Sequence, residues 1–268
     1  MQGVPKSSGK RDRAVVIMAA GQGKRMKDPT RAKVMYELNG KPMIHYVVDL
    51  AYDLGAQRVI LIVGHQRETV TGYVTQSHPD VLSAMQDQQL GTGHAVMQAE
   101  EALKGFEGDV VVLSGDVPML TVSTMQQLFH HHSGTKAVAT ILTAVLDDPT
   151  GYGRIIRNSG GFVEKIVEHR DANPEELRVK EINSGIYVFR KMDLFDGLRH
   201  VNTDNSQHEY YLTDVFGYFW KNHGAVSALV AEKPDEIHGI NTVEQLEQAR
   251  LILEARQRAE TAFHGRKS

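Results

Sequence analysis

Apolar positions in the first half of the chain form short β-branched runs, and the segments between these runs have helical spacing. The runs lie at residues 14–18, 58–63, 81–85 and 109–113, with helical patterns at 43–55, from the second run to about residue 76, and at 93–103. Continuously apolar strands that alternate with helices are typical of a parallel sheet covered on both faces. The pattern therefore predicts an α/β fold with a doubly wound, mostly parallel, Rossmann-like sheet. Ligands of such sheets bind outside the carboxyl ends of the strands.

The second half of the chain is richer in strands. Apolar runs at 136–146, 152–158, 161–169 and 184–190 follow one another closely, and a Ser-Gly-Gly turn at 159–161 indicates a hairpin. Helical patterns around 208–222 and 242–262 enclose a further run at 225–231. We expect a strand-rich insertion on the parallel sheet, followed by a long charged helix that packs outward as a connector.

Composition narrows the class of protein. The 268 residues carry a net charge of −3, which does not favour a nucleic-acid or anionic-membrane surface. The absence of cysteine excludes a disulfide framework, a thiolate metal site and a cysteine nucleophile. No apolar run approaches the ~20 residues that span a bilayer, and no apolar segment of a signal peptide follows the basic residues 1–13. We expect a cytoplasmic protein with a mobile tail at 1–13, and we interpret His130–His132 as a solvated surface patch rather than a metal site.

The first apolar run ends in a glycine loop with two adjacent cations, "AVVIMAAGQGKRM" at 14–26. A dinucleotide fingerprint would place a third glycine at position 26, where this chain has Met26. A P-loop would end in Gly-Lys-Ser or Gly-Lys-Thr, which is also missing here. Taken alone, the loop is explained as well by a tight turn with solvated cations as by a phosphate site.

Further motifs favour the phosphate site. "GQGKRM" followed by Lys33 resembles the signature of sugar-nucleotidyltransferases. Other stretches resemble the uridylyltransferase domain of bacterial N-acetylglucosamine-1-phosphate uridylyltransferases, in order along the chain: "QLGTGHAV" (89–96), "SGDVPML" (114–120), "DDPTGYGRI" (147–155), "IVEHRDA" (166–172), "EINSGIY" (181–187), "EYYLTD" (209–214) and "GINT" (239–242). The chain departs from the family pattern at Lys24, where threonine is usual, and at "PTRAK", which has an added residue.

The resemblance implies an enzyme that transfers a uridylyl group from UTP to N-acetylglucosamine 1-phosphate, giving UDP-N-acetylglucosamine and pyrophosphate. It implies that Arg25 holds the leaving pyrophosphate and Lys33 the α-phosphate, while glycine-rich backbone approaches the phosphates. The loop residues assigned to the substrate are Met18, Ala19, Ala20, Gly21 and Gly23.

Magnesium is the expected cofactor, because Mg²⁺ takes hard oxygen ligands from one or two protein groups and from phosphates. Asp116 follows the buried run "VVVLSG" and so lies at a strand's carboxyl end, beside Ser114 and Gly115, where the glycine permits close approach. By resemblance the second ligand is Asn241, although asparagine at that position is equally suited to cap the last helix. Arg25, Lys33 and Asp116 are the expected catalytic residues.

Residues for the base and the sugar complete the candidate site. The amide of Gln86 can pair with a uracil edge, with Gly91 and Thr92 where the next helix begins, and Thr92 is also suited to cap that helix. We assign His94 to helix surface or packing. The residues assigned to the sugar, mainly by resemblance, are Gly153, Glu168, Asn183 and, more weakly, Tyr211 and Thr213.

The expected organisation is a tail at 1–13, a nucleotidyltransferase domain at 14–241 and a helix and tail at 242–268. Within the domain, nucleotide binding falls to about 14–120 and sugar binding to about 136–230. Three alternatives stay open: a transferase that uses glucose 1-phosphate or another triphosphate, a non-catalytic nucleotide-sugar sensor, and an oxidoreductase, which Met26 disfavours. No hexapeptide repeat of an acetyltransferase domain follows the last helix, and the sequence leaves open whether the chain is a stand-alone enzyme or a truncation.

Overall fold

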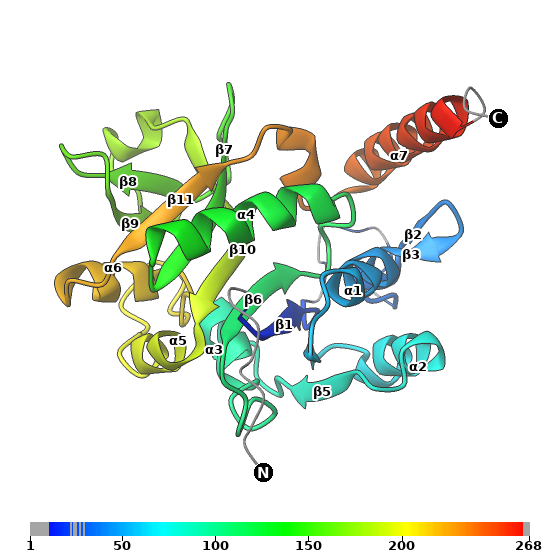
Figure 1. Ribbon diagram of the computed structural model, residues 1–268, viewed down its shortest axis with the longest axis horizontal. Coiled ribbons are helices and arrows are strands. Elements are labelled where there is room, and N and C mark those ends of the chain that lie inside the picture. Colours follow the sequence, from blue (N-terminus) through cyan, green and yellow to red (C-terminus); the bar gives the residue numbers. More distant parts are fainter. Residues whose placement is uncertain (1–10, 22, 24–25, 27, 29, 265–268) are drawn as a thin grey trace, which may run out of the picture.

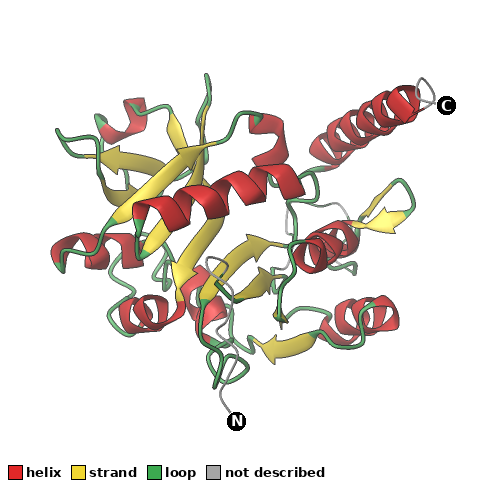
Figure 2. Ribbon diagram, viewed as in Figure 1, coloured by secondary structure: helices red, strands yellow, loops and turns green. Residues whose placement is uncertain are grey.

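The computed structural model describes residues 11–21, 23, 26, 28 and 30–264. Strands of the central sheet are β1 (Arg13–Met18), β4 (Arg58–Val63), β5 (Leu82–Met85), β6 (Asp109–Ser114), β7 (Ala139–Val145), β10 (Glu181–Arg190) and β11 (Val226–Val230). They lie side by side in the order β11-β7-β10-β6-β1-β4-β5 (Figures 1 and 2).

The half of the sheet built from the first part of the chain is parallel. β1 pairs in parallel with β4 and with β6, so that Val15 lies between Val59 and Val111, and β4 pairs in parallel with β5. The middle of β1 is fully buried, as expected for a strand covered on both faces. Parallel pairing in this half is confirmed.

Strand β10 joins the two halves of the sheet. It runs antiparallel to both β6 and β7, and β11 is parallel to β7. The strand-rich second half therefore extends the same sheet. The predicted hairpin is confirmed: β8 (Arg154–Arg157) and β9 (Val163–Val167) are antiparallel, and Asn158 N donates to Phe162 O at 2.9 Å across the turn.

Helices cover both faces of the sheet (Figure 2). Val15 and Ile17 face a layer formed by α1 (Met43–Asp53), α2 (Arg67–Ser77) and α4 (Val122–Thr135). Ala14 and Val16 face a layer formed by α3 (Thr92–Met97), α5 (Lys191–Leu198) and α6 (Asp214–Lys221). Alternate residues of one strand thus feed two apolar cores, and the predicted doubly wound α/β fold is confirmed.

Several elements differ from the prediction. The helix expected around 208–222 begins only at Asp214, because Tyr210 N donates to Leu90 O and Gly93 N to Tyr210 O, at 2.8 and 2.7 Å. The helix expected at 93–103 ends at Met97 and continues as turns. Helix α5 was not predicted from the sequence.

The expectation for the three adjacent histidines is wrong for one of them. His130 is exposed, but His132 is 3% exposed and its Nδ1 lies 2.7 Å from Thr140 Oγ1. Its Nε2 lies 3.8 Å from Asp109 Oδ1. The helix turns this face of its last turn toward β7, where an imidazole has polar partners. In the described part of the chain, no group of three or more His, Cys, Asp or Glu could hold a metal ion.

The two ends of the described chain lead into the sheet at one end and away from it at the other. Residues 1–10 of the expected tail lie outside the described residues, whereas Arg11 pairs with Asp109 at 3.2 Å and Arg13 begins β1. At the other end, α7 (Val243–His264) packs Ala249 on a small apolar cluster with Leu38 and Met43, and its far end projects from the body (Figure 1).

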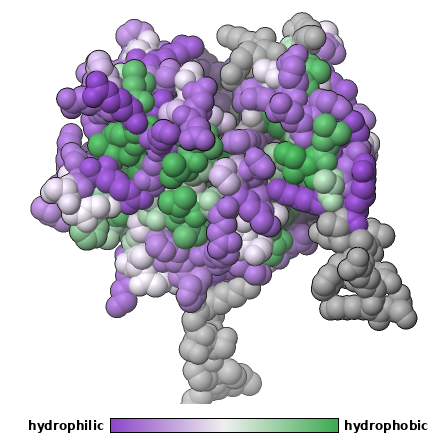
Figure 3. Space-filling view, turned by 90° about the horizontal axis from the view of Figure 1, so that it is seen from above, coloured by the Kyte–Doolittle hydropathy of each residue, from purple (hydrophilic) through white to green (hydrophobic). Residues whose placement is uncertain are grey.

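Figure 3 shows one face of the molecule, on which apolar side chains lie in separate patches between hydrophilic ones. Among the described helices, none combines the length and the apolar character needed to cross a membrane.

Candidate functional site

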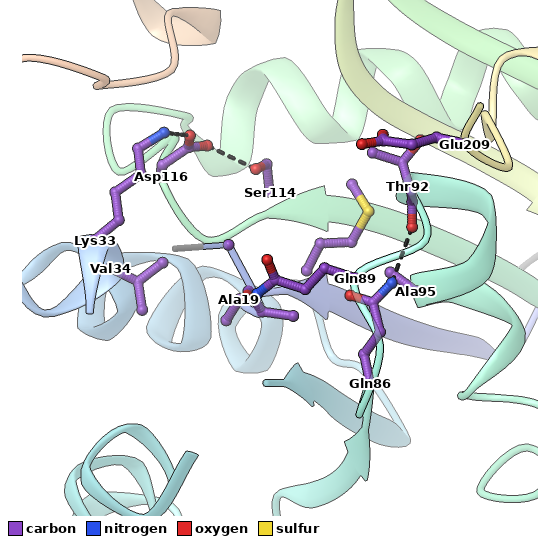
Figure 4. A pocket seen from close by; sticks show the side chains of 14 residues that line it. Ala19, Lys33, Val34, Gln86, Gln89, Thr92, Ala95, Ser114, Asp116 and Glu209 are labelled. Atoms are coloured by element: carbon purple, nitrogen blue, oxygen red, sulfur yellow. Dashed lines mark hydrogen bonds and ion pairs between the residues drawn. The ribbon is translucent and has the colours of Figure 1, made fainter. Parts of the chain in front are cut away.

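A cleft of about 290 Å³ opens at the carboxyl ends of β1 and β6 (Figure 4). The structure brings ten of the predicted site residues into its lining: Met18, Ala19, Ala20, Gly21, Lys33, Gln86, Gly91, Thr92, Ser114 and Asp116. Four lining residues were not among the predicted site residues, although three of them lie in the quoted stretches 89–96 and 209–214: Val34, Gln89, Ala95 and Glu209. Glu209 comes from the second half of the chain, so both halves contribute to one cleft.

At one end of the cleft, the ammonium group of Lys33 contacts two oxygens from distant segments. Its Nζ forms an ion pair with Asp116 Oδ2 and donates to Asn241 Oδ1 at 2.7 Å. The other carboxylate oxygen of Asp116 accepts a hydrogen bond from Ser114 Oγ at 2.6 Å (Figure 4). We call Lys33, Ser114, Asp116 and Asn241 the Lys33 cluster. The side chains of Lys33 and Asp116 are 13% and 16% exposed, so the cluster is reachable from solvent.

Local hydrogen bonds fix Asn241 in this position. Ile240 N donates to Asp116 O at 2.9 Å, which ties the 239–241 turn to the end of β6. Asn241 Nδ2 donates to Gly239 O at 2.9 Å, which leaves its Oδ1 toward Lys33. The helix that follows is capped by Thr242, whose Oγ1 accepts from Gln245 N at 3.2 Å. Asn241 is therefore not the cap of α7.

The donor set of the Lys33 cluster fits a divalent cation with oxygen ligands. A carboxylate and an amide oxygen converge on one point, and a positively charged group already lies there, namely the ammonium of Lys33. Two protein oxygens with room for phosphates and water are what Mg²⁺ ordinarily uses.

The glycine loop is packed against Lys33. Gly23 has φ +62°, and a Cβ at this position would lie 2.7 Å from Lys33 Cβ, so any other residue would displace one of the two. Met26 is buried, and its N donates to Gly23 O at 2.8 Å. Arg25, the predicted contact to pyrophosphate, lies outside the described residues.

Packing against the core explains why residue 115 is a glycine. A Cβ there would lie 3.0 Å from Val34 Cγ1 and 3.1 Å from Ile44 Cδ1, so this face of the residue is closed by the core. Glycine at this position lets α1 and the 33–35 turn approach the end of β6.

The other end of the cleft is formed by Gln86 and the Gly91–Thr92 turn. Gln86 is 4% exposed, and its Nε2 donates to Gly91 O at 3.0 Å. Gly91 has φ +108° and passes so close to Tyr210 that a Cβ would lie 2.6 Å from Tyr210 O. Thr92 Oγ1 accepts a hydrogen bond from Leu212 N at 3.0 Å. Thr92 is thus not the helix cap, a position taken by Gly91, and instead ties this turn to the second half of the chain.

Most of the residues predicted for the sugar form a second group beside the 210–213 segment. Thr213 Oγ1 donates to Glu168 Oε1 at 3.1 Å, and Asn183 Nδ2 donates to Tyr187 Oη at 2.8 Å. A Cβ on Gly153 would lie 3.4 Å from both Asn183 Cβ and Glu168 Oε2. We call Gly153, Glu168, Asn183, Tyr187 and Thr213 the Glu168 cluster.

Burial dominates the electrostatics of the Glu168 cluster. It raises the pKa of Glu168, although the hydrogen bond from Thr213 opposes the shift. The carboxylates of Asp214 and Asp171 raise it further. Burial also raises the pKa of Tyr187, a member of the cluster that the sequence did not predict. Tyr211 is buried too, but its hydroxyl accepts from Gln207 Nε2 at 2.8 Å and so serves the neighbouring loop.

Comparison with known proteins agrees with this geometry. The family model described as "Nucleotidyl transferase" matches residues 14–236, which include β1, the cleft and the Glu168 cluster. The chain belongs to the nucleotidyl transferase family. It is therefore an enzyme, a nucleotidyltransferase.

Individual relatives of this nucleotidyl transferase are proteins named "Bifunctional protein GlmU". That of Geobacillus thermodenitrificans is 48% identical over 244 residues, which cover 91% of this chain and 52% of the relative. That of Clostridium botulinum (strain ATCC 19397 / Type A) is 45% identical over 241 residues, 90% of this chain and 52% of the relative. The chain spans about half the length of the curated relatives it matches.

A solved structure shares the fold. The crystal structure of UDP-glucose pyrophosphorylase complexed with UDP-glucose superimposes with a TM-score of 0.74 at 19% sequence identity. The likeness covers 91% of this nucleotidyl transferase and 99% of that chain. The solved structure therefore has the same fold as the mixed sheet described above.

Proposed function

We propose that the chain transfers a uridylyl group from UTP to N-acetylglucosamine 1-phosphate in a Mg²⁺-dependent reaction. The observation that carries the proposal is the convergence of Asp116 and Asn241 oxygens on a cation, at one end of a cleft whose other end holds the amide of Gln86. Identity of 45–48% to the two GlmU proteins supports the same choice of reaction.

In the proposed reaction an oxygen of the sugar phosphate attacks the α-phosphorus of UTP. The new oxygen–phosphorus bond forms as the bond from the α-phosphorus to its bridging oxygen breaks, and pyrophosphate leaves with the electron pair. The chain then has to neutralise charge and align oxygens, and it needs no protein nucleophile. Lys33 stabilises the charge on the α-phosphate, and Arg25 holds the β and γ phosphates. In this proposal the backbone amides of Gly21 and Gly23 contact the phosphates, because glycine permits close approach.

Asp116 and Asn241 would hold the magnesium ion. When bound, Mg²⁺ offsets the repulsion between two phosphate-bearing substrates. With Asp116 and Asn241 engaged in this way, Lys33 would be available to contact phosphate oxygens. Ser114 keeps one carboxylate oxygen of Asp116 in place through its 2.6 Å hydrogen bond.

The base and the sugar bind at the remaining parts of the site. Gln86, Gly91 and Thr92 receive the uracil ring. In the Glu168 cluster, Glu168 accepts hydrogen bonds from sugar hydroxyls, and Asn183 meets the acetamido group or a neighbouring hydroxyl. Gly153 admits the sugar, because a Cβ at this position would point at both polar side chains.

A matrix of substrates tests the proposal. Pyrophosphate release is measured with each nucleoside triphosphate against the 1-phosphates of N-acetylglucosamine, glucose and glucosamine. We expect UTP with N-acetylglucosamine 1-phosphate to give the highest kcat/KM. A higher value with glucose 1-phosphate would contradict the acceptor and keep the reaction class. Binding of UDP-N-acetylglucosamine without turnover of any pair would identify a sensor instead.

A further inference from the structure

Gln66 has a backbone conformation that residues other than glycine rarely adopt. It lies in the turn between β4 and α2, and its φ is +54°, in the left-handed region. The conformation costs free energy for glutamine but not for glycine. Residues held in this way gather at functional sites, where the surrounding structure maintains them. A reason for glutamine at this position has to come from its side chain.

The amide of Gln66 forms two hydrogen bonds with backbone atoms of residues 30–32, and the orientation of the amide follows from both. Ala32 N can only donate, and it donates to Gln66 Oε1 at 2.7 Å. Thr30 O can only accept, and it accepts from Gln66 Nε2. A flipped amide would lose both bonds. Because Ala32 is 1% exposed, its N–H would then be left without water as a substitute partner.

Residues 30–32 lead directly into Lys33. Within the described part of the chain, the other hydrogen bonds of these three residues stay inside 28–37. The same residues belong to "PTRAK", where the chain has an added residue relative to the family pattern. The bonds from Gln66 are therefore the ones that connect this longer segment to the turn after β4.

The turn that carries Gln66 is itself fixed beside the cleft. A Cβ on Gly64 would lie 3.0 Å from Ala20 Cβ, so the turn passes close to a residue of the cleft lining. On the other side, Ala32 begins the short turn that contains Lys33, and Met35 N donates to Ala32 O at 2.9 Å. The backbone of Lys33 is thus held from both directions, by the Gln66 amide before it and by a buried turn after it.

We infer that Gln66 is a positioning residue for Lys33, whose amide holds the backbone of residues 30–32 so that the ammonium group of Lys33 reaches the cleft. The inference rests on the proposed function, which assigns Lys33 to the α-phosphate of UTP. Gln66 is not among the described residues that line the cleft, so it acts through Lys33 and not by contact with a ligand. A displacement of about 1 Å in a group that meets the reacting atoms can cost on the order of 10²-fold in rate.

A double-mutant cycle tests whether Gln66 acts through Lys33. Gln66→Gly removes the amide and also the strain of the positive φ, and it is combined with Lys33→Ala. Gln66→Ala removes the amide and keeps the strain. For each protein, Kd for UTP with Mg²⁺ is measured by calorimetry, and kcat and the KM for the sugar phosphate are measured from pyrophosphate release. Urea unfolding gives the stability of each variant.

In both Gln66 variants we expect kcat to fall about tenfold and Kd for UTP to rise, with the KM for the sugar phosphate unchanged. In the Lys33→Ala protein, Gln66→Gly should have little further effect, because the group that Gln66 positions is gone. Gln66→Gly should unfold at a higher urea concentration than Gln66→Ala and yet be no more active. His223→Gly is the control: this exposed residue has φ +60° outside the cleft, so the substitution should raise stability and leave kcat at the wild-type value.

Three results would overturn the inference: wild-type kcat and Kd in both Gln66 variants, activity that recovers together with stability in Gln66→Gly, or effects of the two substitutions that multiply in the double variant. The binding cycle separates this failure from failure of the proposed function. A wild-type protein that turns over no pair of substrates refutes the proposed reaction, while a rise in Kd for UTP that requires Lys33 would still support the role of Gln66.

Discussion

In the Lys33 cluster, full charges meet one another within reach of solvent. In the Glu168 cluster, polar side chains meet through hydrogen bonds, and burial opposes the charge of the carboxyl group. Lys33 and Asp116 form an ion pair, and their side chains are 13% and 16% exposed. Glu168 accepts from a neutral hydroxyl, that of Thr213, and its pKa is raised.

Under the proposed function, the difference corresponds to two kinds of ligand. Phosphates are charged, so the residues proposed to bind them can form ion pairs with one another before the ligand binds. They then exchange these ion pairs for contacts with the phosphate oxygens. A sugar brings hydroxyl and amide groups, which are recognised by fixed acceptors and donors. Substitutions in the Lys33 cluster should therefore impair catalysis with little effect on the free energy of unfolding. Substitutions around the Glu168 cluster should alter stability as well.

The largest expected effect is that of Asp116→Asn. The substitution leaves an oxygen for hydrogen bonding but removes the negative charge of the proposed metal ligand. We expect kcat to fall by about 10³-fold or more, beyond the loss of a single charge-stabilising donor, with little change in the free energy of unfolding. Steady-state release of pyrophosphate measures it.

The matched control for Asp116→Asn is Asp147→Asn, because that carboxylate is fully exposed and pairs with Lys180 at 3.1 Å. It should keep wild-type activity. Turnover of the wild type in excess chelator, or wild-type kcat in Asp116→Asn, would refute the magnesium assignment.

Lys33→Ala should have the next largest effect. Loss of a group that meets charge in the transition state costs on the order of 10²–10³ in kcat. The KM for the sugar phosphate should change little, since Lys33 is assigned to UTP. Lys41→Ala serves as control, because Lys41 is exposed and contacts His45 outside the cleft. Near-normal kcat in Lys33→Ala would contradict a catalytic role for the glycine loop and Lys33.

Gly91→Ala tests the connection between the two halves of the site. The residue has φ +108°, and the new Cβ would lie 2.6 Å from Tyr210 O, so we expect a loss of about 1–3 kcal/mol in the free energy of unfolding. Gly72→Ala is the matched control. Gly72 lies within α2 with no atom within 4 Å of its Cβ position, so that substitution should stabilise the protein by up to about 1 kcal/mol. Urea denaturation of both variants measures the contrast, and equal effects would contradict it.

The smallest expected effect is a pH dependence that arises from Glu168. Because its pKa is raised above the ordinary value of 4.5, the folded protein retains this proton at pH values where the unfolded chain has released it. Ionised Glu168 therefore lowers stability at neutral pH, and this cost vanishes as the pH falls through the raised pKa to the ordinary one.

Glu168→Gln removes the titrating group and should be more stable than the wild type at neutral pH. The advantage should shrink toward zero in acid, as measured by Tm across a pH series. A constant difference in Tm at every pH would show that packing, and not the charge, causes the effect. Glu164→Gln provides the control, because Glu164 is half-buried near the start of β9, the strand that ends just before Glu168.

Much of the fold could be predicted from the sequence, for a definite reason. Strands such as β4, predicted at 58–63 and observed there, are apolar throughout because helices cover both of their faces. The start of α6 could not be predicted in this way. Residues 210–212 have helical spacing, but their backbone groups bond to a loop more than a hundred positions earlier, through Leu90, Thr92 and Gly93.

The same limit applies to the candidate site. Motifs along the chain predicted the lining of the cleft well, because residues such as Ala19 and Gly21 follow directly from the end of β1. They could not indicate that Lys33 contacts Asn241, since 208 positions separate the two. The contact of His94 with Gln86 was also missed, because helical spacing does not show which polar atoms meet. The roles of these residues in the reaction stay predictions.

One consequence of the Lys33 cluster concerns the stability of the protein without Mg²⁺. Because the ammonium of Lys33 forms an ion pair with the carboxylate of Asp116, the charge of that carboxylate is offset by the protein itself. We therefore expect the fold not to depend on the proposed Mg²⁺. Prolonged storage in chelator should abolish activity without unfolding the protein. Full activity should return as soon as Mg²⁺ and nucleotide are supplied together.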